Sequence, residues 1–214
     1  MRQLTTLLAA AVLAVGVALG AAAGPMTGTF TIDVYRGNGG GSIGAAGVQA
    51  LATNPLITGT PYAVVTYTGD IDFFLGSGGT NTIAAFLNSG TGSYTATGGA
   101  LNVQLSAGGF AQTTVLDIYG STAVGLTGTV THDDGIGIYQ GNVLVTAVAA
   151  SAPTSPVGTS YSLAAGDFRI VYVAANGLPE QLSITATPVP EPMSMALLGA
   201  GLVGLAGLRR RRPA

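Results

Sequence analysis

The 214-residue sequence has no cysteine, no lysine and a single histidine, His132. The absence of cysteine excludes disulfides, thiolate zinc sites, iron–sulfur clusters and thiol catalysis. Any Ser-His-Asp triad would have to use His132. Acidic pairs are the remaining catalytic option, and Asp70 and Asp72 lie two residues apart on one expected strand face. We interpret that pair as solvated carboxylates near a turn.

Charge is also scarce, at 7% of all residues. Between its apolar ends, the chain has two basic residues, Arg36 and Arg169, against eight acidic ones, a formal charge of −6. The acidic residues are Asp33, Asp70, Asp72, Asp117, Asp133, Asp134, Asp167 and Glu180. We expect no nucleic-acid partner, because phosphate neutralisation requires Lys and Arg. Divalent cations and neutral sugars are more natural ligands for such a surface.

The N-terminal end, residues 1–23, has the pattern of a secretory signal peptide. Arg2 gives it a positive start, residues 7–20 are a continuous apolar run, and residues 21–23 offer small side chains for cleavage. The alternative is a membrane-spanning anchor, but the apolar run is shorter than the ~20 residues that a span needs. We therefore predict that the protein is exported.

The C-terminal end, residues 188–214, has three parts in a clear order. Residues 188–192 include three prolines, which fix φ and remove amide donors, so this strip is expected to be extended and exposed. Residues 193–208 carry no charge and would form a transmembrane helix ~24 Å long, slightly short for a ~30 Å hydrocarbon core. The arginines at 209–212 would stay on the cytoplasmic side, which places the body outside.

This order of parts resembles the PEP-CTERM sorting signal, which the membrane enzyme exosortase is thought to recognise. The sorting residues that the resemblance implies are Pro190, Glu191, Pro192, Arg209, Arg210, Arg211 and Arg212. The implied partners are exosortase and the secretion machinery. The implied route begins at the inner membrane, where the C-terminal helix holds the protein before processing, and ends at the cell surface or extracellular matrix. A plain C-terminal membrane anchor is the alternative.

The body, residues 24–187, has the composition of an all-β protein. Thr, Val, Ile and Tyr favour strands, and Gly and Asn interrupt them at short intervals. Strands are expected at residues 30–35, 63–67, 70–74, 101–105, 114–119, 126–131, 136–139, 143–148, 168–173 and 181–187. Short helices are expected at residues 45–52 and 82–87. We predict a single, jelly-roll-like β-sandwich with one or two short helices, between a signal helix and a transmembrane helix.

The segment Asp133-Asp134-Gly135 lies between two of the expected strands. It suits a tight turn, because Asp bonds its own backbone and Gly accepts positive φ. Adjacent carboxylates on a loop can also bind Ca²⁺ through oxygen ligands. Both interpretations, structural turn and cation site, stay open, and His132 is interpreted as a strand-end residue.

The order of motifs in the body, best from Val130 onward, resembles the protective-antigen-type β-sandwich domain, which is also found in flocculin-like lectins. In that family an Asp-Asp-Gly turn leads to a strand with a second turn, for which this chain has Gly141-Asn142 instead of the usual Asp-Gly. A later strand ends in tyrosine, here near Tyr172. The resemblance implies that Asp133 and Asp134 hold Ca²⁺, which orients sugar hydroxyls.

These patterns predict a non-enzymatic envelope or matrix protein that binds calcium or glycans of the exopolysaccharide layer. One alternative is a purely structural or adhesive coat protein without a small ligand. The least supported alternative is an extracellular hydrolase that uses Asp70, Asp72 or Asp133.

Overall fold

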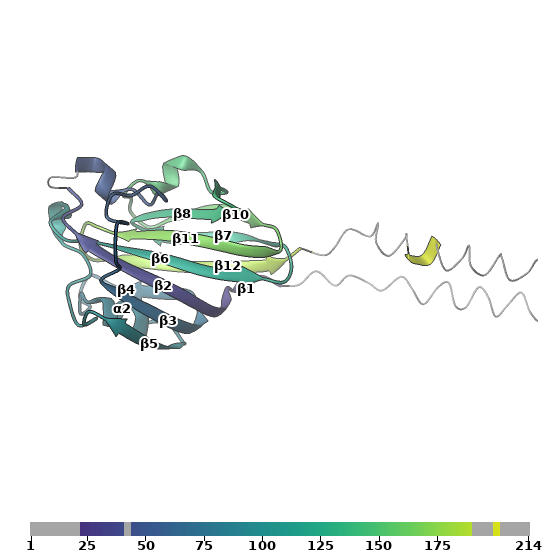
Figure 1. Cartoon of the computed structure of the whole chain (residues 1–214), viewed down its shortest axis with the longest axis horizontal. Coiled ribbons are helices and arrows are strands. Elements are labelled where there is room, and N and C mark those ends of the chain that lie inside the picture. The colour runs from purple at the N-terminus through teal and green to yellow at the C-terminus, as the bar shows by residue number, and fades with distance from the viewer. Residues whose placement is uncertain (1–21, 41–43, 190–198, 202–214) are drawn as a thin grey trace, which may run out of the picture.

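The computed structural model describes residues 22–40, 44–189 and 199–201. Its body is two facing antiparallel β-sheets with short helical turns, which confirms the expected all-β sandwich (Figure 1). The signal helix, residues 41–43 and nearly all of the expected transmembrane helix lie outside the described residues. Within the described part of the chain, no helix is long and apolar enough to cross a membrane.

The larger sheet has seven strands, and it faces the viewer in Figure 1. Every neighbouring pair is antiparallel. In spatial order the strands are β5 (Ser93–Gly98), β3 (Ala63–Asp70), β2 (Thr27–Gly37), β6 (Thr113–Thr122), β11 (Gly166–Ala174), β8 (Gly135–Gln140) and β9 (Val143–Leu144).

The smaller sheet has five strands and packs behind the first. Its order is β1 (Gly24–Pro25), β12 (Glu180–Pro188), β7 (Leu126–Asp133) and β10 (Val157–Leu163), and β4 (Asp72–Leu75) also pairs with β12. Gly24 pairs with Ala186, so the two ends of the body leave the sandwich on the same side. At the other end of β12, Gln181 pairs with Asp133.

The core between the sheets follows from strand alternation. In β3, the buried residues Ala63, Val65 and Tyr67 alternate with exposed ones, as expected for a strand with one face on the core. Aromatic side chains cross this core in contact with one another: Tyr67 and Phe73 meet edge to face, with ring centroids 5.0 Å apart. Further along, Phe86 stacks on Tyr172 at 5.5 Å, and such pairs add to the free energy gained by burial.

The outer face of the larger sheet is partly covered as well. Val115, Val171 and Val173 on that face pack against Val48 and Ala50. The covering segment approaches closely because β8 has glycine on this face. A side chain at Gly137 would collide with the carbonyl oxygen of Ala50, and one at Gly135 with that of Ser151. Burial on both faces explains why residues 113–118 of β6 are continuously buried.

Helical structure is limited to short segments. The expected helix at 82–87 is α2 (Ile83–Asn88), capped by the Thr82 hydroxyl, which accepts a bond from the amide of Ala85 at 3.1 Å. The expected helix at 45–52 is replaced by a 3₁₀ turn, η1 (Gly44–Val48). Two further 3₁₀ turns are η2 (Gly108–Phe110) and η3 (Val148–Ser151).

Two expected strands are wrong in whole or in part. Residues 101–105 contain one isolated bridge and no strand, and their alternation comes from packing on α2. The carbonyls of Leu101 and Val103 accept bonds from the first amides of that helix, at 2.9 and 3.1 Å. The strand expected at 143–148 ends at Leu144, because η3 begins at Val148.

Candidate functional site

The site lies at the end of β7, where Asp133 ends the strand and Gly135 begins β8. Asp133 and Asp134 are both nearly excluded from solvent, with 6% and 4% of their surface exposed. The peptide bond between them is cis. The chain bends at Asp134, but Gly135 belongs to β8 and does not have the positive φ that the predicted tight turn assumed, and two adjacent carboxyl groups lie in a mostly buried position.

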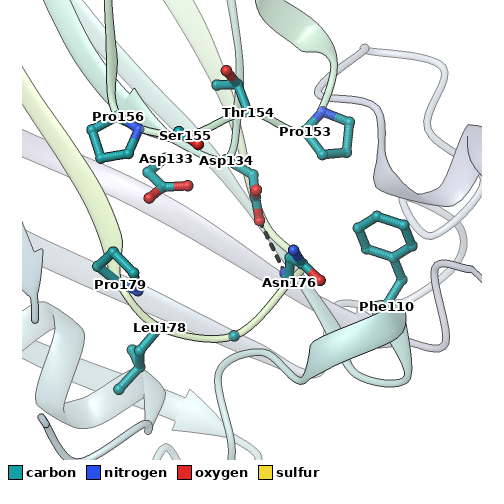
Figure 2. Close-up of a pocket in the computed structure, with 11 residues that line it drawn as sticks. Phe110, Asp133, Asp134, Pro153, Thr154, Ser155, Pro156, Asn176, Leu178 and Pro179 are labelled. Atoms are coloured by element: carbon teal, nitrogen blue, oxygen red, sulfur yellow. Dashed lines mark hydrogen bonds between the residues drawn. The ribbon is translucent and has the colours of Figure 1, made fainter. Parts of the chain in front are cut away.

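The Asp134 carboxylate is held by the backbone. Its Oδ2 accepts hydrogen bonds from the amides of Ala175, at 2.8 Å, and Asn176, at 3.0 Å (Figure 2). Burial raises the pKa of Asp134, while bonds from the amides of Ala175, Asn176 and Thr154 act in the opposite direction. These bonds fix the carboxylate and join the turn to the end of β11.

The Asp133 carboxylate has a different environment. Among the described residues, no group donates a hydrogen bond to it. Burial raises the pKa of Asp133 to about 6, with a smaller contribution from the neighbouring charge of Asp134. The carboxylate oxygens of Asp133 are not among the fully buried atoms without a partner, so they remain accessible from the adjoining cavity, where a cation could contact them.

Both carboxyl groups border a cavity of about 470 Å³, shown in Figure 2. Its walls come from three segments distant in sequence: the turn at 133–134, the loop at 153–156 and the loop at 176–179, with Phe110 at one side. Thr154, Ser155 and Asn176, which carry polar side chains, belong to the same lining. The volume is in the range of small-molecule sites, ~300–1,000 Å³.

His132 stabilises the segment at Asp133 and Asp134 through hydrogen bonds of its ring. The ring is fully buried, with Nδ1 2.6 Å from the Asp134 carbonyl oxygen and Nε2 2.8 Å from the Thr159 hydroxyl. A carbonyl oxygen can only accept, so Nδ1 carries the proton and Nε2 accepts from Thr159. Burial lowers the pKa of His132, which keeps the ring neutral. Both ring nitrogens are thus engaged, in agreement with a supporting role.

A second buried hydrogen-bond network connects Asp133, Tyr172 and Glu180. The Tyr172 hydroxyl contacts both the Asp133 carbonyl oxygen and Oε2 of Glu180, the latter at 2.8 Å. A hydroxyl has one proton to donate, and the carbonyl can only accept it, so Glu180 must donate in turn to the tyrosine oxygen. Burial raises the pKa of Glu180 to about 9, consistent with a protonated carboxyl group.

The other sequence-predicted residues lie elsewhere. Asp70 accepts bonds from the hydroxyls of Thr27 and Thr91, the second at 2.9 Å, and so has a structural role between strands. Asp72 is in β4, opposite Ser183. The sorting residues at 190–192 and 209–212 lie outside the described residues. Within the described ranges, no group of three or more His, Cys, Asp or Glu side chains is placed to hold a metal.

Several cavity residues were not predicted. The loop at 153–156 and Phe110 are far from the turn in sequence, and no motif connects them to it. Asn176 had a usable signal, because it opens Asn-Gly-Leu-Pro directly after a strand.

Comparison with known proteins gives two findings. Residues 188–212 match the PEP-CTERM protein-sorting motif. A solved PA14 sugar-binding domain from an RTX adhesin is similar in structure, with a TM-score of 0.55 and 18% sequence identity over 74% of this chain and 89% of that chain. No curated protein matches the sequence. The chain therefore combines a β-sandwich that has the fold of a PA14 sugar-binding domain with a C-terminal PEP-CTERM sorting motif.

Proposed function

We propose that this protein is an exported, non-catalytic surface protein that binds glycans at the Asp133–Asp134 cavity with the help of Ca²⁺. The observation that supports this most directly is Asp133, a residue only 6% exposed, whose carboxylate borders the cavity and receives no hydrogen bond from the described residues. The fold it shares with a sugar-binding domain of an adhesin agrees with this role.

The residues present fit Ca²⁺. It prefers oxygen ligands, and the carboxylates of Asp133 and Asp134 would balance its charge. Thr154, Ser155 and Asn176, whose side chains carry neutral oxygens, line the same cavity. Because the protein offers only two carboxylates there, other coordination positions remain for ligand oxygens. A bound Ca²⁺ would supply a positive charge that orients vicinal sugar hydroxyls.

The direct test uses the purified full-length chain in detergent. Calcium titration by calorimetry and a glycan array with and without EDTA should show saturable Ca²⁺ binding and EDTA-sensitive glycan binding. The double variant Asp133→Asn, Asp134→Asn should lose both, while Asp72→Asn, an exposed aspartate in β4, should keep both. Wild-type protein that binds neither Ca²⁺ nor any glycan would rule out the sugar site.

A structural or adhesive coat protein is the second candidate, and the hydrogen bonds to Asp134 favour it. The backbone amides of Ala175 and Asn176, just after β11, donate hydrogen bonds to that carboxylate. These bonds alone would explain an aspartate at position 134, without any ligand. On this alternative, the combined Asp133→Ala and Asp134→Ala change alters stability but no ligand affinity.

For the route to the surface, we propose recognition by exosortase and processing near Pro190, Glu191 and Pro192. Before processing, residues 193–208 hold the protein in the inner membrane, with the body outside and the arginines at 209–212 inside. We propose that the bound glycan is part of the exopolysaccharide layer, where the sorted protein would be located.

A further inference from the structure

We propose that the outer face of the larger sheet carries a second sugar site, which binds one neutral pyranose ring and needs no metal. It is a pocket of about 280 Å³ between β6, the start of β11 and the turn that connects β8 with β9. This volume is close to the lower limit of small-molecule sites, ~300 Å³, so the pocket suits a single ring.

The floor of the pocket is formed by side chains from β6, β11 and β8, which are neighbouring strands of the larger sheet (Figure 1). Arg169 of β11 pairs with Tyr119 of β6 on one side and with Tyr139 of β8 on the other, so all three side chains lie on the same face. Tyr139 is buried, and its hydroxyl accepts a bond from the amide of Ala52 at 3.0 Å. Tyr119 is 38% exposed and lines the pocket, and the central carbon of the Arg169 guanidinium lies over one face of its ring, 5.8 Å from the ring centroid.

The guanidinium of Arg169 is fixed before any ligand arrives. Its Nε and Nη2 donate to the two oxygens of the fully buried Asp117 at 2.6 and 2.8 Å. The Tyr119 hydroxyl donates to the same carboxylate at 2.7 Å. Among the described residues, the Nη1 group of Arg169 donates to no partner, and the side chain is 24% exposed. The Nη1 group of Arg169 is therefore an oriented hydrogen-bond donor that is available to a ligand.

The rim adds Asn142 and Asp167, both exposed and both without a side-chain hydrogen bond in the described part of the chain. Gly141 and Asn142 have positive φ, 54° and 66°, which is the geometry of a two-residue hairpin turn. The side-chain amide of Gln140 donates to the carbonyl oxygen of Ala164 at 2.8 Å and accepts from the backbone amide of Ala164 at 2.7 Å. This tie fixes the turn against the residues that lead into β11.

These groups match the chemistry of a neutral pyranose. The ring of such a sugar has an apolar face of C–H groups, which would pack on Tyr119, and hydroxyls that both donate and accept. Arg169 offers donors, Asp167 offers an acceptor and Asn142 offers both. The three carboxylates Asp33, Asp117 and Asp167 and one guanidinium leave a local formal charge of −2, which disfavours sugar acids and phosphates. Asp117 already accepts three bonds, so no cation is needed to satisfy it.

The pocket is separate from the Asp133–Asp134 cavity. Ala175, whose amide bonds to Asp134, directly follows β11 and lies six residues after Arg169, a distance of roughly 20 Å in extended chain. The two sites can therefore be tested independently, since only the first is proposed to depend on Ca²⁺.

The test is ligand-observed NMR on the full-length chain in detergent and EDTA. The probes are the methyl pyranosides of mannose, glucose and galactose. At least one should bind wild-type protein, and the double variant Asn142→Gly, Asp167→Ala should weaken that binding about tenfold, as expected for the loss of two hydrogen bonds. Tyr119→Ala should weaken it at least as much. Phe74→Ala, which truncates an exposed aromatic on β4, and Asp133→Asn with Asp134→Asn should leave it unchanged within about twofold.

Three results would overturn the proposal: no binding of any of these pyranosides in EDTA, binding that the Asn142 and Asp167 changes leave intact, or tighter binding of methyl glucuronide than of methyl glucoside. Tyr119→Ala removes a donor from buried Asp117 and risks misfolding. The Asn142→Gly, Asp167→Ala variant avoids that risk, because its glycine tolerates the positive φ and its lost side chains make no bonds within the described residues.

Discussion

At the scale of single residues, the buried carboxyl of Glu180 makes stability depend on pH. Burial raises its pKa from 4.5 to about 9, so the folded protein keeps a proton that the unfolded chain loses. The resulting stabilisation is complete below pH 4.5 and is lost as pH rises towards 9, at up to about 1.4 kcal/mol per pH unit.

Glu180→Gln, which stays neutral at every pH, should remove this loss. Urea unfolding of the full-length chain at pH 5, 7 and 9 should show an advantage of the glutamine variant that widens with pH. Asp72→Asn, at an exposed position in β4, is the control for the loss of one acidic group. Parallel pH profiles for wild type and Glu180→Gln would show that Glu180 is ionised in the folded protein.

The two aspartates of the turn should respond differently to truncation. Asp134→Ala leaves the amides of Ala175 and Asn176 without their acceptor and should cost roughly 1–3 kcal/mol of unfolding free energy. Asp133→Ala removes a carboxylate that receives no hydrogen bond from the described residues, so at pH 7 it should leave stability unchanged or higher. Unfolding midpoints measured in EDTA check the difference, and equal losses for both variants would contradict it.

At the scale of elements, the helix α2 depends on its cap. Thr82→Ala removes the hydroxyl that accepts from the Ala85 amide and should lower the unfolding free energy by about 1 kcal/mol. Thr80→Ala, a nearby exposed threonine whose side chain makes no hydrogen bond with the described residues, is the matched control. Thermal unfolding of both variants checks this, and similar shifts for the two would argue against a capping effect.

The sequence predicted the strands that bury alternate residues, because burial imposes a period of two. Strand β3 and the first half of β2 belong to this class, whereas β6 and β11 are buried on both faces and were expected from their β-branched and aromatic residues. The edge strands β5 and β10 were missed, because they are mostly exposed and polar and are defined by pairing with a distant neighbour.

The candidate site was predictable only where it is local in sequence. Adjacent aspartates before a glycine predicted a tight turn; the chain does bend at Asp134, without the expected positive φ at Gly135, and cation binding there stays a prediction. The walls at 153–156 and 176–179 come together through the pairing of β7 with β10 and β12. Residues 101–105 show the reverse error, since apolar alternation alone cannot distinguish a strand from a segment packed on a helix.

At the scale of the whole molecule, the sorting motif and the candidate sugar cavity lie at opposite ends of the body. β12 begins beside Asp133 and ends at Pro188, where the motif starts. Nine strand residues span roughly 30 Å, so a body attached through its C-terminal side would present the cavity away from the attachment.

Sorting itself is testable by mass spectrometry of the mature C-terminus. In cells with exosortase, the chain should end or be joined near Pro190, Glu191 and Pro192 and should lack the arginines at 209–212. In cells without the enzyme, the arginines should remain. Replacement of Glu191 by alanine should reproduce the second pattern, with Glu180→Gln as the control for a change in the body. Identical C-termini in both strains would indicate a plain anchor.

The antiparallel pairing of β7 with β12 also determines how the molecule bears a pulling force. A ligand at Asp133 pulls on the C-terminal end of β7, and an attachment beyond Pro188 pulls on the C-terminal end of β12, in the opposite direction. The two strands are therefore loaded in shear, and the hydrogen bonds between them share the load instead of opening one after another. A glycan held at the cavity would thus be connected to the attachment point through the mechanically resistant direction of the sheet.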